Sequence, residues 1–399
     1  MLLTSIIVLI VALTLSGCAT STQAPKSSGP IKIGALFPLT GPYAMWGGWF
    51  KDGVPFALDE VNWQVAGRKI NVTIEDEGGE DISVALEKTK KLVESDKVDI
   101  ILGPFYGGAR MAVYPYTSKI PILAVSAWNT SIAEAQNKYT IWTVQSYVDS
   151  QAPLGIYAYD KLGLRTVVSI GADYACPYEF TQGVTDTFQE KGGKLLQQQW
   201  APLTETDYTP YLVSMKAADA MISTCLGPPA MMTLYKQFAQ LGLNKKYRMM
   251  QAEDGAIPQF VMDDIGGVML GTLQCNSYHY KVDNPANKKY VAAFQAKFKR
   301  MPEAMDAYIY VAIQTILAGL EATGGDTNPD KLYSAITKLK LDTIEGPLSF
   351  IPEGQPITNH YILEVKNVGG KYTQEILETI KSSTPRIYNG SKYKKFGAK

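Results

Sequence analysis

The sequence has few of the residues on which catalytic and metal-binding sites usually depend. It contains only two histidines among 399 residues, His279 and His360, and their positions show no metal-ligand spacing. A Gly-x-Ser-x-Gly elbow, a P-loop and a Gly-x-Gly-x-x-Gly after a strand-like segment are all missing. These absences exclude the common nucleophile–base arrangements, so we predict neither an enzyme nor a bound cofactor or metal ion.

The sequence also has few cysteines and no net charge. There are four cysteines, and none has the C-x-x-C spacing typical of a metal or redox site. The motif around Cys18 predicts a lipidation site, which leaves Cys176, Cys225 and Cys275. A disulfide between Cys225 and Cys275 is one possible pairing, but three cysteines do not specify which two are joined. The 38 basic residues balance 38 acidic ones. Because a nucleic-acid-binding protein needs a basic face, we expect no nucleic-acid partner.

The N-terminal residues have the pattern of an export signal. Residues 2–15 are uncharged and mostly apolar, but they are fewer than the roughly 20 residues that a spanning helix needs. The run ends in Leu15-Ser-Gly-Cys18, which resembles a bacterial lipobox and implies lipidation of Cys18. An ordinary signal peptide that ends near a cysteine is the alternative. We therefore expect a signal peptide at 1–17, a flexible, lipid-anchored linker at 18–30, and an extracytoplasmic protein held at a bacterial membrane.

The remaining chain, about 370 residues, exceeds what one hydrophobic core normally holds, which predicts two lobes. Strand-like and helix-like patterns alternate, an order typical of right-handed βαβ units with parallel sheets. The end of the chain, 344–350 and 361–376, has an extended pattern, and the sequence does not say which lobe it joins. The predicted strands are 31–37, 70–75, 98–102 and 120–125 in a first set, and 165–170, 195–200, 219–225 and 247–251 in a second.

Aromatic and small polar residues follow several predicted strands. Ligands of open α/β sheets bind at the carboxyl ends of the strands, and an aromatic wall with a few polar groups is typical of a small-molecule pocket. The glycine-rich loop 103–108 lacks the Lys-Ser/Thr of a nucleotide site, so its following helix N-terminus is expected to receive a carboxylate. The candidate pocket residues are Tyr43, Trp46, Tyr106, Trp128, Asn129, Thr130, Tyr174 and Asp254.

A set of motifs in a fixed order identifies a family. The segment Ile31-Lys-Ile-Gly-Ala-Leu-Phe-Pro-Leu-Thr-Gly-Pro-Tyr-Ala-Met-Trp-Gly47 resembles the opening of type I periplasmic binding proteins, above all the Leu/Ile/Val-binding group that feeds ABC importers. Further matches are Leu58-Asp-Glu-Val-Asn62, Ile101-Leu-Gly-Pro104, Asp173-Tyr-Ala175, Glu253-Asp-Gly255 and Glu345-Gly-Pro-Leu-Ser-Phe350. The likeness covers nearly the whole mature chain.

The resemblance implies a two-lobed α/β fold in which each lobe is a parallel sheet flanked by helices and three crossovers form the hinge. It implies a first lobe of 31–147 with 276–355, a second of 148–275 with 356–385, and a basic tail at 386–399. A monomer that closes on a small molecule and delivers it to permease subunits is the implied function. A ligand sensor of the same fold is the alternative.

The resemblance also assigns roles in the cleft. Gly107 stands where the family has a hydroxyl residue for the ligand carboxylate, and backbone amides can replace it. Thr130 matches the family's threonine that contacts the head group of an amino-acid ligand. Trp128 matches a position whose backbone carbonyl accepts from the ligand. Trp46 replaces a cleft tyrosine, and Tyr310 matches a late cleft aromatic residue.

The remaining roles concern charge and ligand choice. Asp254, or Glu253 if the loop is shifted by one, matches the acid that binds an ammonium group. Cys176 and Pro177 replace a Tyr-Gly pair, and Leu226 replaces an aromatic residue. These departures argue against a standard Leu/Ile/Val ligand. An amino acid or a related small carboxylate or amide is expected, with aromatic acids and urea-like amides as alternatives.

Overall fold

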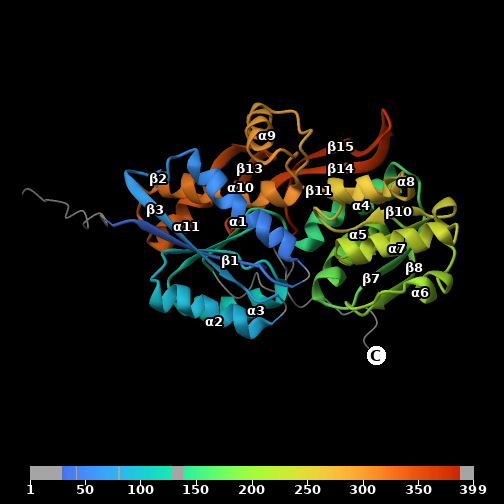
Figure 1. Ribbon diagram of the computed structural model, residues 1–399, viewed down its shortest axis with the longest axis horizontal. Helices are drawn as coiled ribbons and strands as arrows, with labels where there is room; N and C mark the ends of the chain where they lie inside the picture. Colours follow the sequence, from blue (N-terminus) through green and yellow to red (C-terminus); the bar gives the residue numbers. More distant parts are fainter. Residues whose placement is uncertain (1–28, 42, 80, 128–137, 387–399) are drawn as a thin grey trace, which may run out of the picture.

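The computed structural model describes residues 29–41, 43–79, 81–127 and 138–386, and these form two α/β lobes side by side (Figure 1). The predicted signal peptide, Cys18, most of the linker and residues 387–399 of the tail lie outside this part of the chain. So do Trp128, Asn129 and Thr130. No helix among the described residues combines the length and the apolar character needed to cross a membrane.

The first lobe is built on a six-stranded sheet in the order β2-β3-β1-β4-β5-β6. β1 pairs in parallel with β3 and β4, and β5 joins β4 to β6 in the same sense. The central strands are almost wholly apolar and buried because helices cover both faces. The strands are β1 (Ile31–Phe37), β2 (Gln64–Val65), β3 (Arg68–Asp76), β4 (Ile100–Leu102), β5 (Leu123–Ser126) and β6 (Thr140–Trp142).

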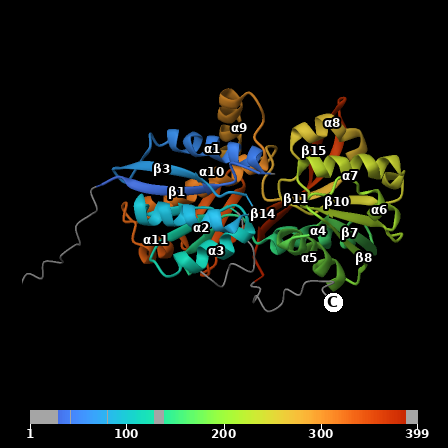
Figure 2. The same ribbon diagram turned by 60° about the horizontal axis from the view of Figure 1, so that its bottom comes forward.

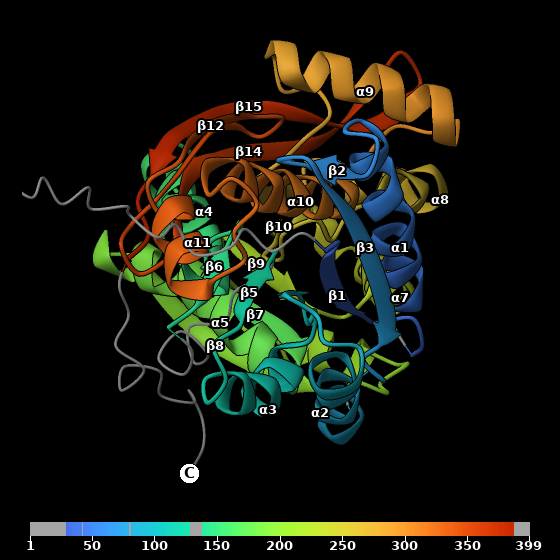
Figure 3. The same cartoon turned by 90° about the vertical axis from the view of Figure 1, so that its left-hand side faces the viewer.

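Helices from both ends of the chain complete the first lobe. Figure 3 shows α2 and α3 below the strands and α10 above them, with α9 outermost. The helices are α1 (Ala44–Asp59), α2 (Ile82–Lys90) followed by η1 (Lys91–Ser95), α3 (Gly107–Thr117), α9 (Pro285–Phe298), α10 (Ala304–Ala322) and α11 (Pro329–Ile336). α10 packs along α1, so a late segment closes the core that the first strands begin.

The second lobe holds a nine-stranded sheet in the order β12-β13-β14-β11-β10-β9-β7-β8, with β15 paired to β14. Strands β7 to β11 are parallel. They are β7 (Thr166–Ala172), β8 (Lys194–Ala201), β9 (Ala220–Thr224), β10 (Arg248–Gln251) and β11 (Leu273–Asn276). The helices are α4 (Tyr147–Asp160), α5 (Ala175–Glu190), α6 (Thr209–Val213), α7 (Pro228–Gln240), η2 (Leu243–Lys245) and α8 (Gln259–Met269).

The late strands connect the lobes. β12 (Lys340–Thr343), β13 (Gly346–Phe350), β14 (Pro356–Val368) and β15 (Lys371–Ser383) are antiparallel, and β14 joins them to β11. The side chains of Leu348 and Phe350 nevertheless pack in the core of the first lobe. Figure 2 shows β14 running between the lobes, so this ribbon belongs to the hinge region of the molecule.

Candidate functional site

A cavity lies between the lobes at the carboxyl ends of their parallel strands. Loops after β1 and β4 and the start of α10 line it from the first lobe, and loops after β7 and β10 line it from the second. The start of α4 also contributes to the lining. Seven of its twelve lining residues are aromatic. The full set is Tyr43, Trp46, Phe105, Tyr106, Gly107, Tyr147, Tyr174, Cys176, Phe180, Glu253, Asp254 and Met305.

Trp46 and Tyr43 form one aromatic wall. Tyr43 is the N-cap residue of α1, and its ring stacks on that of Trp46 with 4.8 Å between centroids. Phe105 meets both rings edge-on. Only 2% of Trp46 is exposed, and its indole Nε1 has no hydrogen-bond partner among the described residues. Because a buried N–H without a partner costs free energy, an acceptor on a bound molecule would be favoured here.

Two buried ionisable residues, Glu77 and Arg110, hold the loop after β4 by hydrogen bonds. Glu77 accepts hydrogen bonds from the backbone N–H groups of Phe105 (2.8 Å) and Tyr106 (3.1 Å). Burial raises the pKa of Glu77 to about 8. Arg110 donates to the Phe105 carbonyl and, at 2.8 Å, to the Tyr147 hydroxyl oxygen. Since Tyr147 accepts from Arg110, its own proton is available to another acceptor.

A hydrogen bond crosses the cleft between the lobes. The hydroxyl of Tyr174, the N-cap residue of α5, lies 2.9 Å from the Tyr43 hydroxyl. Neither Tyr174 nor Tyr106, the N-cap residue of α3, uses its side chain to cap its helix. The N-termini of α3 and α5, one from each lobe, lie at the cavity. Their helix dipoles favour a negatively charged group between them.

Two adjacent acids differ in what holds them. The Asp254 carboxylate accepts from the Ser277 N–H (3.3 Å), the Ser277 hydroxyl (3.2 Å) and the Tyr308 hydroxyl. Glu253 accepts a hydrogen bond from the Cys225 N–H at 3.0 Å. Burial raises the pKa of Tyr43, and the nearby Glu253 carboxylate raises it further. Burial raises the pKa of Glu253 to about 7 and that of Asp254 to about 6. The Asp254 carboxylate is thus already engaged by Ser277 and Tyr308, and Glu253 is the acid beside the aromatic wall.

The structure brings together six of the candidate pocket residues singled out in the sequence: Tyr43, Trp46, Tyr106, Gly107, Tyr174 and Asp254. Tyr310 is not among the residues that line the cavity. Its hydroxyl donates to Glu60 at 2.9 Å and its ring packs against Tyr290, in the core of the first lobe. The cavity is reached instead by Met305 of the same helix. At 1.5 Å per residue Tyr310 begins about 7.5 Å further along α10 than Met305.

Several lining residues were missed in the sequence. Phe105 lies within the glycine-rich loop 103–108 and could have been found from that position. Tyr147 and Phe180 occupy helical positions whose sequence pattern is that of core residues. Their ring centroids are 4.4 Å apart. A hydrophobic helix position carries no local signal that distinguishes a core contact from a cavity wall.

The cysteine pairing considered from the sequence is also corrected. Cys225 lies against Cys176, with 3.5 Å between the two Sγ atoms. Cys275 is buried in a separate core cluster of the second lobe, and the three described cysteines are all free thiols. Because 49 residues separate Cys176 from Cys225, no spacing motif reveals the pair.

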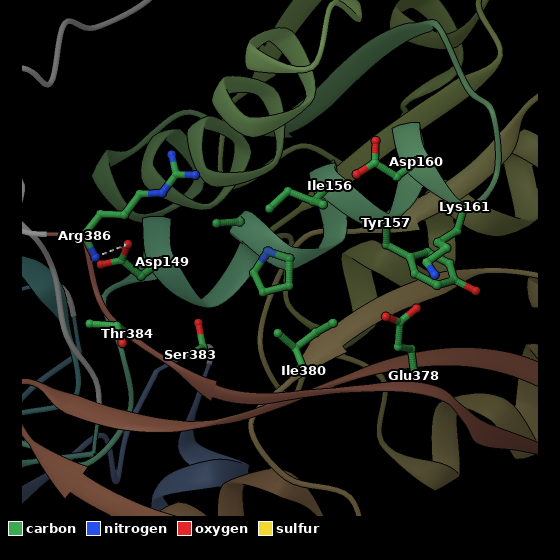
Figure 4. A pocket seen from close by; sticks show the side chains of 12 residues that line it. Asp149, Ile156, Tyr157, Asp160, Lys161, Glu378, Ile380, Ser383, Thr384 and Arg386 are labelled. Atoms are coloured by element: carbon green, nitrogen blue, oxygen red, sulfur yellow. Dashed lines mark hydrogen bonds between the residues drawn. The ribbon is translucent and has the colours of Figure 1, made fainter.

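A second cavity lies on the second lobe, between α4 and β15 (Figure 4). Ile156, Tyr157 and Ile380 form its apolar part, and Asp160, Lys161 and Glu378 stand at its rim. Asp149 accepts the backbone N–H of Arg386 at 3.0 Å, so the described chain ends at this cavity. It does not lie between the sheets' strand ends and has no aromatic wall, which makes the interlobe cavity the candidate ligand site.

Comparisons with known proteins agree with this architecture. A family model described as "Periplasmic binding protein" matches residues 30–371. Leu/Ile/Val-binding protein homolog 6 of Brucella suis is 25% identical over 368 residues, covering 90% of this chain and 93% of that protein. A solute-binding protein of an ABC transporter from Rhodopseudomonas palustris BisB5, solved with 3,4-dihydroxybenzoic acid, has a TM-score of 0.81 and 25% identity, covering 89% of this chain and 98% of that chain. Another R. palustris solute-binding protein, solved with 4-hydroxybenzoate, has a TM-score of 0.82, 25% identity and the same coverage. The leucine-binding protein LivK of Thermotoga maritima shares the fold, with a TM-score of 0.78 at 22% identity and coverage of 88% and 99%.

Proposed function

Since this chain belongs to the periplasmic binding protein family, whose members are substrate-binding proteins of ABC transporters and not enzymes, we propose that it captures a small aromatic carboxylate of the hydroxybenzoate type and delivers it to an ABC permease. The observation that carries the proposal is the aromatic lining of the interlobe cavity. Tyr43, Trp46, Phe105 and Tyr106 enclose it from the first lobe, and Tyr147 adds a ring at the start of α4. Flat rings on several sides favour a planar apolar ligand because aromatic pairs gain stacking and edge contacts beyond simple burial.

The ends of the cavity suggest how such a ligand is oriented. The carboxylate lies between the N-termini of α3 and α5, where backbone amides near Gly107 and the proton of Tyr147 donate to it. A ring hydroxyl of the ligand meets Glu253, which lines the same cavity. The two similar R. palustris proteins that were solved with hydroxylated benzoates support this ligand class.

Closure of the cleft accompanies capture. The two lobes that move relative to each other are residues 31–147 with 276–355 and residues 148–275 with 356–385. A ligand that touches both lobes stabilises their closed arrangement because it gains contacts only there.

Titration calorimetry with 4-hydroxybenzoate, 3,4-dihydroxybenzoate and leucine tests the ligand class. We expect the two benzoates to bind, and at about a thousandfold excess over Kd to stabilise the protein against heat by about 4 kcal/mol. The control is leucine, which lacks a ring. Tight binding of leucine with no binding of either benzoate would contradict the proposal.

An amino acid is the second candidate, favoured by the buried carboxylate of Glu253 in the cavity wall. If an amino acid binds, Glu253→Gln should weaken it by on the order of 2–4 kcal/mol, because the ammonium then lies buried without a counter-charge. Asp254→Asn should mainly lower the free energy of unfolding, by about 1–3 kcal/mol, because Ser277 and Tyr308 lose a charged acceptor.

The same two variants separate the candidates. Calorimetry and thermal unfolding on both variants measure the ligand effect and the stability effect independently. An aromatic acid should be nearly indifferent to Glu253→Gln, since glutamine still accepts a hydrogen bond. A confirmed amino-acid ligand that is weakened by Asp254→Asn and not by Glu253→Gln would place its ammonium at Asp254 instead.

Anchoring through Cys18 is part of the proposal. The motif Leu15-Ser-Gly-Cys18 and the polar linker after it support a lipidated N-terminus. Cells fed radiolabelled palmitate should incorporate label into the wild-type protein and not into Cys18→Ser, because only a thiol at this position receives the lipid. Equal labelling of the two proteins would refute anchoring at Cys18.

A further inference from the structure

The thiols of Cys176 and Cys225 form a pair at the edge of the ligand cavity. Their Sγ atoms are 3.5 Å apart, and Cys176 lines the cavity. Cys176 lies in the first turn of α5, and Cys225 follows β9 in the loop before α7. A disulfide has an S–S length of about 2.05 Å, so the two atoms need to approach by about 1.5 Å, a shift within reach of small side-chain rotations.

The surroundings of the pair favour a disulfide over a metal site. No group of three or more His, Cys, Asp or Glu side chains that could hold a metal ion occurs in the described ranges. The one other cysteine in the part of the chain that the structure describes, Cys275, lies in a different core cluster. The family to which the chain belongs is extracytoplasmic, and disulfides form and persist in such compartments.

We propose that Cys176 and Cys225 are joined by a disulfide in the exported protein, and that this bond fixes the second-lobe wall of the ligand cavity. The proposal does not depend on which ligand the cavity binds. It identifies the two residues as an oxidative modification site, and it leaves Cys275 as a buried free thiol.

The oxidation is a thiol–disulfide exchange. One cysteine, as its thiolate, attacks a disulfide of the oxidant, a dithiol oxidase or a small-molecule disulfide such as oxidised glutathione, and releases one oxidant thiol. The second cysteine then attacks the mixed disulfide and releases the other. The two cysteines lose two protons and two electrons in total, and the oxidant disulfide gains both as two thiols.

The folded state dictates when this exchange occurs. Burial raises the pKa of both thiols, and Cys225 is fully buried, so neither is a reactive thiolate once the lobe has formed. The bond therefore forms during folding after export, while both cysteines are accessible. Later reduction is slow for the same reason.

The bond would act directly on cavity geometry. The N–H of Cys225 donates to Glu253, and Cys225 holds a left-handed backbone conformation with φ of 47°. Linking its side chain to the first turn of α5 fixes both the Glu253 contact and the Tyr174–Cys176 segment. The redox state of one pair of sulfur atoms thereby sets how rigid this side of the cavity is.

Differential alkylation tests the proposal on the full-length protein isolated from an export-competent bacterium. The denatured protein is treated with N-ethylmaleimide before and after reduction. Reduction should expose two additional thiols, and peptide mapping without reductant should find the peptides of Cys176 and Cys225 linked. Reductant should lower the Tm by roughly 5 °C, because a cross-link over 49 residues restricts the unfolded chain.

Matched variants make the result specific. Cys275→Ser should still gain two labels on reduction, whereas Cys176→Ser and Cys225→Ser should gain none and should show a Tm that is insensitive to reductant. The proposal is overturned if the wild-type protein, also after unfolding and refolding with oxidised glutathione, gains no label on reduction. It is equally overturned if the linked peptides include Cys275.

Discussion

Trp46→Ala is expected to weaken binding of the aromatic carboxylate by about 3 kcal/mol, or about 150-fold in Kd. Trp46 is almost fully buried at the cavity and stacks on Tyr43. Its removal takes away one flat wall of the cavity together with the indole N–H that lacks a partner. Calorimetry with 4-hydroxybenzoate measures the change.

Trp49→Ala is the matched control for this measurement. Trp49 lies on the same helix, is partly buried, and holds the Arg300 guanidinium 4.5 Å above its ring, but it does not line the cavity. It should lower stability and leave Kd within about threefold of the wild-type value. If the folded Trp46→Ala protein binds as tightly as the Trp49→Ala protein, the aromatic wall is not the binding surface.

Gly47→Ala is expected to lower the free energy of unfolding by about 3 kcal/mol, the upper end of the usual cost of overpacking. A Cβ at Gly47 would meet the carbonyl oxygen and carbon of Pro38 at less than 3.0 Å. These are backbone atoms of the loop that leads from β1 into α1, so they cannot rotate away as a side chain could. The loop must shift, and Trp46 shifts with it.

The next residue offers a control that differs by one position. A Cβ at Gly48 meets nothing within 4 Å, and its backbone is helical. Gly48→Ala should therefore raise stability by about 0.5–1 kcal/mol, because alanine is the better helix former. Urea unfolding measures both variants. Similar values for the two would show that the close approach at Pro38 does not govern packing here.

Much of the fold was predictable because parallel strands are buried on both faces. Segments such as 31–37 and 98–102 are nearly continuous apolar runs, and the structure has strands at Ile31–Phe37 and Ile100–Leu102. The course of the late ribbon was not predictable. β13 pairs with β14 of one lobe while Phe350 packs into the other, and pairing over such distances leaves no local pattern.

Candidate cavity residues were predictable where a loop follows a strand. Trp46, Tyr106 and Tyr174 were found because strand ends converge at one edge of each sheet. Met305 of α10 lines the cavity and Tyr310 does not, because helical periodicity does not show how far along its axis a helix meets a cavity. Asp254 lines the cavity, but the sequence could not show that Ser277 and Tyr308 already hold its carboxylate.

The hydroxyl–hydroxyl contact between Tyr43 and Tyr174 links the fidelity of transport to its sensitivity. This bond joins the lobes with protein atoms alone and is worth about 0.5–1.5 kcal/mol, a two- to tenfold bias toward closure. A larger closed fraction raises the apparent affinity for cargo, since less free energy is spent on reorganisation. In an importer whose ATPase responds to closed receptors, the same bias raises ATP hydrolysis without cargo. The hydrogen bond between Tyr43 and Tyr174 would then affect two quantities together, the apparent affinity for cargo and the rate of ATP hydrolysis without cargo.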